Sequence, residues 1–217
     1  MKRVVVVSAG LSVPSSTRLL ADRLAAATVA ASDEPIELQT IELRTLAHGL
    51  ADHLVTGFPT GEVAEAISAV GRADALIVVT PVFTASYSGL FKTFVDVMPR
   101  EYFVGKPVLV AATAGSARHS LMLDHAMRPL FSYLKAALVP TGVFAATDDF
   151  GASSDGEDPL RARIDRAAAE LASMLGPRAI ASAGSAGRNL HVVSGQSDLE
   201  DVAPFEELLR RASESGG

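Results

Sequence analysis

A cluster of hydroxyl side chains follows the first apolar segment of the chain. Residues 8–17 read SAGLSVPSST and lead into an amphipathic stretch. Backbone N–H groups at a helix start, together with short hydroxyls, form a site for a phosphate dianion. A single helix cap would need only one hydroxyl, and here four lie within six residues. We predict that these four hold a terminal phosphate, with Arg18 close behind as added positive charge; they are Ser12, Ser15, Ser16 and Thr17.

A second segment, residues 80–96, combines aromatic and small residues in the run TPVFTASYSGLFKTFVD. A planar ring needs N–H groups at its polar edge and flat or small neighbours at its faces, and this run supplies both. The alternative is an ordinary loop with core aromatics, in which Pro81 ends a strand and Ser88 caps a helix over 89–98. The aromatic residues of this run are Phe83 and Tyr87, and the small residues beside them are Ala85, Ser86, Ser88 and Gly89.

The third segment is TAGSARH, residues 113–119. Gly115 and Ser116 are small enough for their backbone to approach a ligand, and Arg118 and His119 are placed to face a second substrate. A plain polar turn is the alternative. His119 and His125 are six residues apart, which puts them on different helix faces, so no metal site is expected.

Composition excludes several classes of protein. The 217 residues contain no cysteine, which rules out disulfide scaffolds, thiolate metal sites and cysteine nucleophiles. A net charge of −6 gives no basic face for nucleic acid. No apolar run approaches the ~18 residues of a membrane span. The apolar run Val4–Val7 is too short for a signal peptide, so we expect a cytoplasmic protein.

Five apolar runs alternate with helical patterns, which predicts a doubly wound α/β protein. Helices are expected from Ser15 or Ser16 onward, over 45–54, around the apolar stripe 63–70, over 123–138 and over 160–175. Pro129 is expected to break the helix over 123–138 near residues 124–126. The expected strands span 3–8, 36–43, 75–80, 107–113 and 139–146. Five parallel strands favour the flavodoxin-like order 2-1-3-4-5, in which ligands bind at the carboxyl ends of the strands. That rule brings the three segments above to one edge of the sheet.

The amino-acid composition of the chain changes near Gly176. Residues 1–176 are predicted to form one flavodoxin-like domain. Residues 177–217 are predicted to be a linker rich in Ala, Gly and Ser followed by a tail, with a possible short helix over 204–212.

Three runs of the sequence, within residues 1–175, resemble the NAD(P)H-dependent FMN reductases. One of them is ARHSLMLDHAMRPLFSYLKAALVPTGVFA, residues 117–145. The run TPVFTASYSGLFKTFVD resembles their signature P-x-[YF]-x-x-S-[YF]-[ST]-G-x-[LF]-K-x-x-x-D, and SAGLSVPSSTRLLADRL resembles their phosphate loop. The nearest likeness is to two-component FMN reductases, which feed reduced flavin to luciferase-like or alkanesulfonate-type monooxygenases. Many relatives open with G-S-x-R, whereas residues 10–13 here read GLSV. Either Arg18 replaces that arginine, or hydroxyls and backbone hold the phosphate alone.

This resemblance implies hydride transfer from the nicotinamide of NADH or NADPH to FMN, with no side chain acting as acid or base. It places the phosphate on the four hydroxyl residues of the first segment. It places the isoalloxazine ring on the second segment, at Pro81, Val82, Phe83, Ala85, Ser86, Tyr87 and Ser88. The backbone of Gly115 and Ser116 would lie near N1 and the C2 carbonyl. It also implies a homodimer or homotetramer, in which residues 123–138 form either the subunit contact or part of the core. The alternatives are a flavin-retaining quinone or azo reductase and a flavodoxin-type electron carrier.

Overall fold

The computed structural model describes residues 1–151 and 158–176, and the predicted linker and tail over 177–217 lie outside these residues. The strands are β1 (Lys2–Ser8), β2 (Ile36–Glu42), β3 (Ala75–Phe83), β4 (Ser86–Tyr87), β5 (Pro107–Ala114), β6 (Ala137–Leu138) and β7 (Val143–Ala146). The helices are α1 (Ser16–Ala30), α2 (Leu43–Thr56), α3 (Gly61–Arg72), α4 (Gly89–Asp96), α5 (Arg128–Tyr133) and α6 (Pro159–Leu175).

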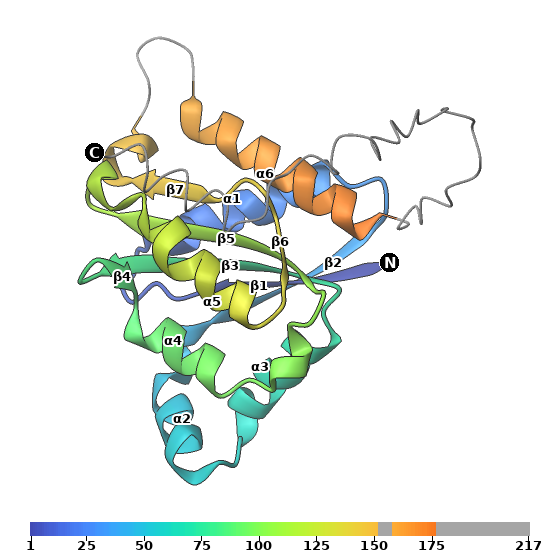
Figure 1. Ribbon diagram of the computed structural model, residues 1–217, viewed down its shortest axis with the longest axis vertical. Coiled ribbons are helices and arrows are strands. Elements are labelled where there is room, and N and C mark those ends of the chain that lie inside the picture. The colour runs from blue at the N-terminus through green and yellow to red at the C-terminus, as the bar shows by residue number, and fades with distance from the viewer. Residues whose placement is uncertain (152–157, 177–217) are drawn as a thin grey trace, which may run out of the picture. The chain divides into compact units, whose positions relative to one another are not determined.

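The sheet is parallel along its main path, which runs β2-β1-β3-β5-β6 (Figure 1). In β1, Val4–Val7 are all buried, as expected of a strand covered on both faces. The predicted edge position of β2 is confirmed, but its burial does not alternate as the sequence suggested, because four consecutive residues, including Leu38, are exposed. The predicted flavodoxin-like α/β sheet is therefore confirmed, with β1 between β2 and β3.

Within residues 1–151 and 158–176 the sheet has seven strands, so the predicted count of five is wrong. The expected strand over 139–146 is shortened to β7, and β6 lies just before it, in residues that were expected to be helical. Both strands pair in parallel with β5. Between them lies Pro140, which has no N–H to donate to a neighbouring strand, so the ladder is interrupted there. The seventh strand is the two-residue β4, which pairs antiparallel with the end of β3.

Helices cover both faces of the sheet, as Figure 1 shows. On one face, α1 and α6 pack Leu20, Leu24 and Ile164 against the sheet. On the other face lie α2, α3, α4 and α5, whose buried side chains include Phe91 and Phe131. The predicted helical stripes are thus confirmed as core. No helix within the described ranges has both the length and the apolar character needed to cross a membrane.

The helix expected over 123–138 is shorter and broken. A π-helical turn spans Leu123–Met127, where the break was predicted, because Pro129 has no N–H to donate to the carbonyl of His125. The following α5 ends at Tyr133. Lys135 has a φ of 59°, which turns the chain so that β6 can join the sheet.

Strand β3 does not end at Pro81 but continues to Phe83 and turns directly into β4. The two turn residues, Thr84 and Ala85, have φ values of 49° and 64°. A two-residue hairpin of type I′ requires this left-handed conformation at both positions, and Asn and Gly adopt it most readily. A β-branched threonine is strained there.

Relieving this strain is expected to stabilise the protein. Thr84→Asn should raise the free energy of unfolding by about 1 kcal/mol, because asparagine tolerates the left-handed region. Ala85→Val should lower it, since a second β-branched residue would then be held at positive φ. Urea unfolding without added ligand measures both. Unchanged stability in Thr84→Asn would contradict the strained turn.

Candidate functional site

The carboxyl ends of β1, β3 and β5 bring the three predicted segments to one cavity of about 370 Å³, here called the rim cavity. Most of its lining was predicted from the sequence as ligand-binding. Its lining residues are Leu11, Ser12, Ser15, Ser16, Thr17, Pro81, Val82, Phe83, Thr113, Ala114, Gly115 and Thr147.

The first segment, residues 8–17, leads into α1 as predicted and is here called the phosphate loop after its predicted role. Ser15 is the N-cap, and its hydroxyl accepts a hydrogen bond of 3.2 Å from the N–H of Arg18. A side chain at Gly10 would collide with the Ser15 hydroxyl, so glycine lets the loop fold closely against the helix. Ser12 and Ser16 are exposed, and their hydroxyls make no hydrogen bond to another described residue. These two hydroxyls are available to a ligand.

Thr17 is placed differently from the three serines. It is only 3% exposed, and its hydroxyl oxygen lies 2.7 Å from that of Thr113 at the end of β5. Its side chain therefore already has a partner, although the residue borders the rim cavity.

Arg18 turns away from the rim cavity. Its Nε is 2.8 Å from Oδ1 of Asp22, and its guanidinium also pairs with Glu42 at the end of β2. The hydrogen bond with Asp22 raises the pKa of Arg18 above its ordinary value. None of the described residues lining the rim cavity carries a formal charge.

Removing the Arg18 charge is therefore expected to have little effect on phosphate recognition. Arg18→Met should change the ratio of KM for FMN to KM for riboflavin by less than about twofold, because the guanidinium is already neutralised by two carboxylates. Steady-state kinetics with both flavins measures the ratio. A rise of about tenfold for FMN alone would mean that Arg18 contacts the phosphate.

The second segment is divided between two cavities by the β3–β4 hairpin. Pro81, Val82 and Phe83 line the rim cavity, with Phe83 46% exposed. Ser86 and Tyr87 line another cavity. Ala85 lies at the exposed turn between them.

Ser88 has a structural position at the start of α4. It is 1% exposed, its N–H donates to the Thr80 hydroxyl, and its own hydroxyl accepts from the N–H of Phe91. It is the predicted helix cap, and it anchors the hairpin to β3.

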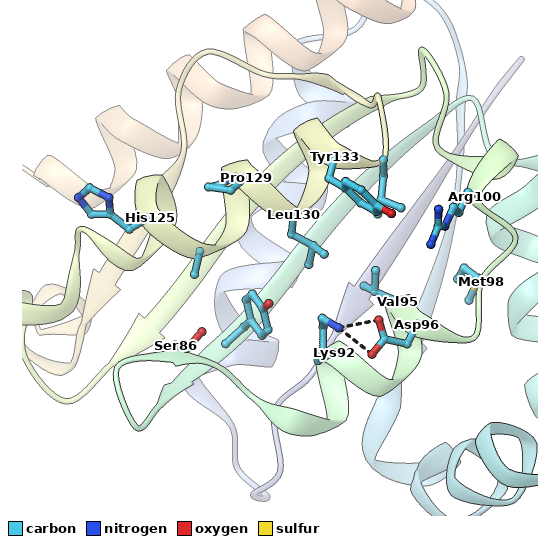
Figure 2. Close-up of a pocket in the computed structure, with 13 residues that line it drawn as sticks. Ser86, Lys92, Val95, Asp96, Met98, Arg100, His125, Pro129, Leu130 and Tyr133 are labelled. Carbon is cyan, nitrogen blue, oxygen red and sulfur yellow. Dashed lines mark hydrogen bonds and ion pairs between the residues drawn. The ribbon is translucent and has the colours of Figure 1, made fainter.

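The second cavity, here called the helix groove, has a volume of about 690 Å³ and lies between α4 and the segment Leu123–Leu134. Figure 2 shows the Lys92–Asp96 ion pair on the α4 side, with Leu130 and Tyr133 across from it. Lys92 Nζ is 2.7 Å from both carboxylate oxygens, so this i,i+4 pair explains the K-x-x-x-D part of the motif. Arg100 stacks on the ring of Tyr133 at 5.2 Å.

The third segment follows β5 at the mouth of the rim cavity. Gly115 is exposed, and a Cβ atom there would meet no heavy atom within 4 Å. Ser116 precedes a short 3-10 turn, Ala117–His119, in which Arg118 and His119 are exposed. Sequence reasoning did not single out Thr147, which lines the cavity from the end of β7. The sequence feature that could have identified Thr147 is its position directly after an apolar run, where a strand would end.

Comparison with known proteins identifies this arrangement. The family model described as NADPH-dependent FMN reductase matches residues 2–151. The chain belongs to the NADPH-dependent FMN reductase family. This confirms the family expected from the motifs, and with it the expectation of an enzyme that uses a reduced nicotinamide to reduce FMN.

Curated relatives cover most of the described chain. The NADH-dependent FMN reductase SfnF of Pseudomonas fluorescens is 40% identical over 174 residues, which is 80% of this chain and 92% of the relative. An FMN reductase (NADPH) of Pseudomonas aeruginosa is 38% identical over 176 residues, 81% of this chain and 94% of the relative.

Two solved structures share the fold of this FMN reductase family member. An oxidoreductase from Corynebacterium diphtheriae is 50% identical with a TM-score of 0.76, covering 81% of this chain and 97% of that one. An NADH:FMN oxidoreductase (EmoB) in its apo form is 31% identical with a TM-score of 0.70, covering 80% of this chain and 89% of that one.

Proposed function

We propose that residues 1–176 bind FMN in the rim cavity and catalyse its reduction by NADH or NADPH. The observation that carries this proposal is the convergence of the three predicted segments on one cavity at the ends of β1, β3 and β5. In open α/β sheets this switch point is where nucleotide ligands bind. The cavity fits FMN because it combines available hydroxyls, a helix N-terminus and an apolar wall.

The phosphate group is assigned to the phosphate loop. Ser12 and Ser16 donate their hydroxyls, and the first N–H groups of the 15-residue helix α1 point toward the same place. The Ser15 side chain caps α1 and thereby stabilises the conformation of the loop. Thr17 contributes its backbone, since its hydroxyl is bonded to Thr113.

The isoalloxazine ring is assigned to the β3–β4 hairpin and the third segment. Pro81, Val82 and Phe83 form the wall of the cavity. Ala85 offers its backbone N–H at the exposed turn, and Ser86, which pairs with Phe83, fixes the position of that turn. Tyr87 and Ser88 support the hairpin from behind, where the Tyr87 ring lies 5.8 Å from that of Phe91. Gly115 and Ser116 place N–H groups beside the pyrimidine edge of the ring.

When bound, FMN supplies the redox chemistry by accepting a hydride from the nicotinamide. The chain aligns the two rings, and no side chain is needed as an acid or base. The N–H groups at Gly115 and Ser116 stabilise the negative charge that reduction places at that edge. This is the largest electrostatic contribution that we assign to the protein.

We further propose that the product, reduced FMN, leaves the enzyme for a partner monooxygenase. The described lining of the rim cavity carries no charge, so a phosphate there forms no ion pair that would slow its release. Because the reaction draws on reduced nicotinamide, we place it in the cytoplasm.

A second copy of the chain is proposed to cover the helix groove. Residues 123–138 were expected to form either the subunit contact or part of the core. Their large apolar side chains are buried in the core, as Leu123, Met127, Phe131 and Leu134 show. The contact is therefore assigned to the outer side of α4 and α5, where Tyr133 is 65% exposed. Sedimentation equilibrium measures the assembly, and a monomer at micromolar concentration would contradict it.

Anaerobic stopped-flow mixing of the protein, FMN and each nicotinamide tests the proposed function. Bleaching of the flavin absorbance by NADH or NADPH is expected, with flavin separating from the protein on gel filtration. Flavin that stays bound and passes electrons to quinones would favour a quinone or azo reductase. Failure of both nicotinamides to bleach the flavin would overturn the proposal in favour of an electron carrier.

A further inference from the structure

Two buried hydroxyls join the phosphate loop to the third segment. Thr17 lies in the first turn of α1 and Thr113 near the end of β5, 96 residues away in sequence. Their Oγ1 atoms are 2.7 Å apart, and each residue is 3% exposed. No other side-chain hydrogen bond between α1 and β5 occurs in residues 1–151 and 158–176.

Both members of this pair line the rim cavity. A hydroxyl has one hydrogen to donate, so the threonine that accepts the bond keeps its own hydrogen for another acceptor. Thr17 adjoins Ser16, a proposed phosphate donor, and Thr113 is two residues before Gly115, which lines the cavity and is proposed to bind the ring. The pair thus stands between the two ends of the cavity.

We propose that Thr17 and Thr113 act as one positioning unit that sets the spacing between the phosphate donors and the donors to the ring. This inference rests on the proposed function. The ribityl chain that links the phosphate to the ring has a limited length. FMN can therefore bind both groups of donors at once only when the distance between them matches that length. Riboflavin has no phosphate and contacts one group, so its binding depends less on the pair.

A double-mutant cycle separates this role from a contribution to folding alone. Thr17→Val or Thr113→Val leaves one hydroxyl buried without its partner, whereas the double variant removes both. Replacing both partners by apolar groups of similar shape is often nearly neutral for stability. Stability is therefore expected to fall in each single variant and to recover in the double variant.

Flavin binding is expected to follow a different pattern. The Kd of FMN, measured by fluorescence titration, should rise about tenfold in each single variant and by a similar factor in the double variant, because the spacing is lost in all three. The Kd of riboflavin should change less than about twofold. Recovery of FMN affinity in the double variant, in step with stability, would overturn the proposal.

Thr28 provides the matched control. It is buried in the same helix α1, and its hydroxyl donates to the carbonyl of Leu24 at 2.8 Å, away from the cavity. Thr28→Val should leave FMN affinity unchanged, and Thr113→Ser should retain it because the hydroxyl remains. An equal loss of FMN affinity in Thr28→Val would contradict the proposed positioning role of the Thr17–Thr113 pair. Failure of the proposed function is distinguishable, because the unaltered protein would then fail to bind FMN.

Discussion

A leucine in place of Gly115 is expected to abolish flavin binding while the protein remains folded. Gly115 lines the rim cavity, and nothing lies within 4 Å of the Cβ position, so the new side chain has room without disturbing the core. Its φ is outside the left-handed region, so a side chain brings no backbone strain. The leucine would occupy the volume assigned to the ring. We expect kcat/KM for FMN to fall about 100-fold or more.

Two further variants make this result specific to the cavity. Gly115→Ala should have a smaller effect, since a methyl group fills less of the cavity. Gly89→Leu is the matched control, because Gly89 also has open space around its Cβ position but lines neither described cavity. Circular dichroism and thermal unfolding report on the fold. Full activity in Gly115→Leu would exclude the rim cavity as the flavin site.

The second large effect is expected from the two available serine hydroxyls. Ser12→Ala combined with Ser16→Ala should raise KM for FMN by at least about 100-fold, because each hydrogen bond to a charged group contributes about 1.5–3 kcal/mol. KM for riboflavin should stay within about twofold, since riboflavin has no phosphate to lose partners. Steady-state reduction of both flavins measures the difference.

Ser15 is left unchanged in this test because its hydroxyl caps α1, and its loss would weaken the helix itself. Ser132→Ala, which removes an exposed hydroxyl remote from the rim cavity, controls for the loss of a surface serine. An equal rise of KM for FMN and riboflavin would contradict the assignment of the phosphate to this loop.

Features set by neighbouring residues were predictable from the sequence. The burial of β1, the edge position of β2 and the caps at Ser15 and Ser88 follow from residue types within one turn or one strand. The motif in residues 80–96 indicated the family, because short spacings preserve the geometry of a hairpin and a helix start. The rule that ligands lie at the carboxyl ends of parallel strands then joined the three segments.

Strand boundaries near proline were less predictable, because the effect of a proline depends on the strands beside it. Pro81 was expected to end a strand, yet β3 continues to Phe83 because β4 folds back and pairs with it. Pro140 has the opposite effect: it lies between β6 and β7, and the strand expected over 139–146 is shortened to β7. The outcome depends on whether an adjacent strand offers partners around the missing N–H.

The sequence by itself determined the fold class, the family and the three segments of the proposed site. Only the tertiary structure decided how each side chain is used. Thr17 is bonded to Thr113, Arg18 is paired with Glu42, and the β3–β4 hairpin divides its residues between two cavities. In each case the partner comes from a distant strand or helix. Local spacing dictates backbone conformation, but hydrogen bonds and ion pairs depend on which groups folding brings within about 3 Å.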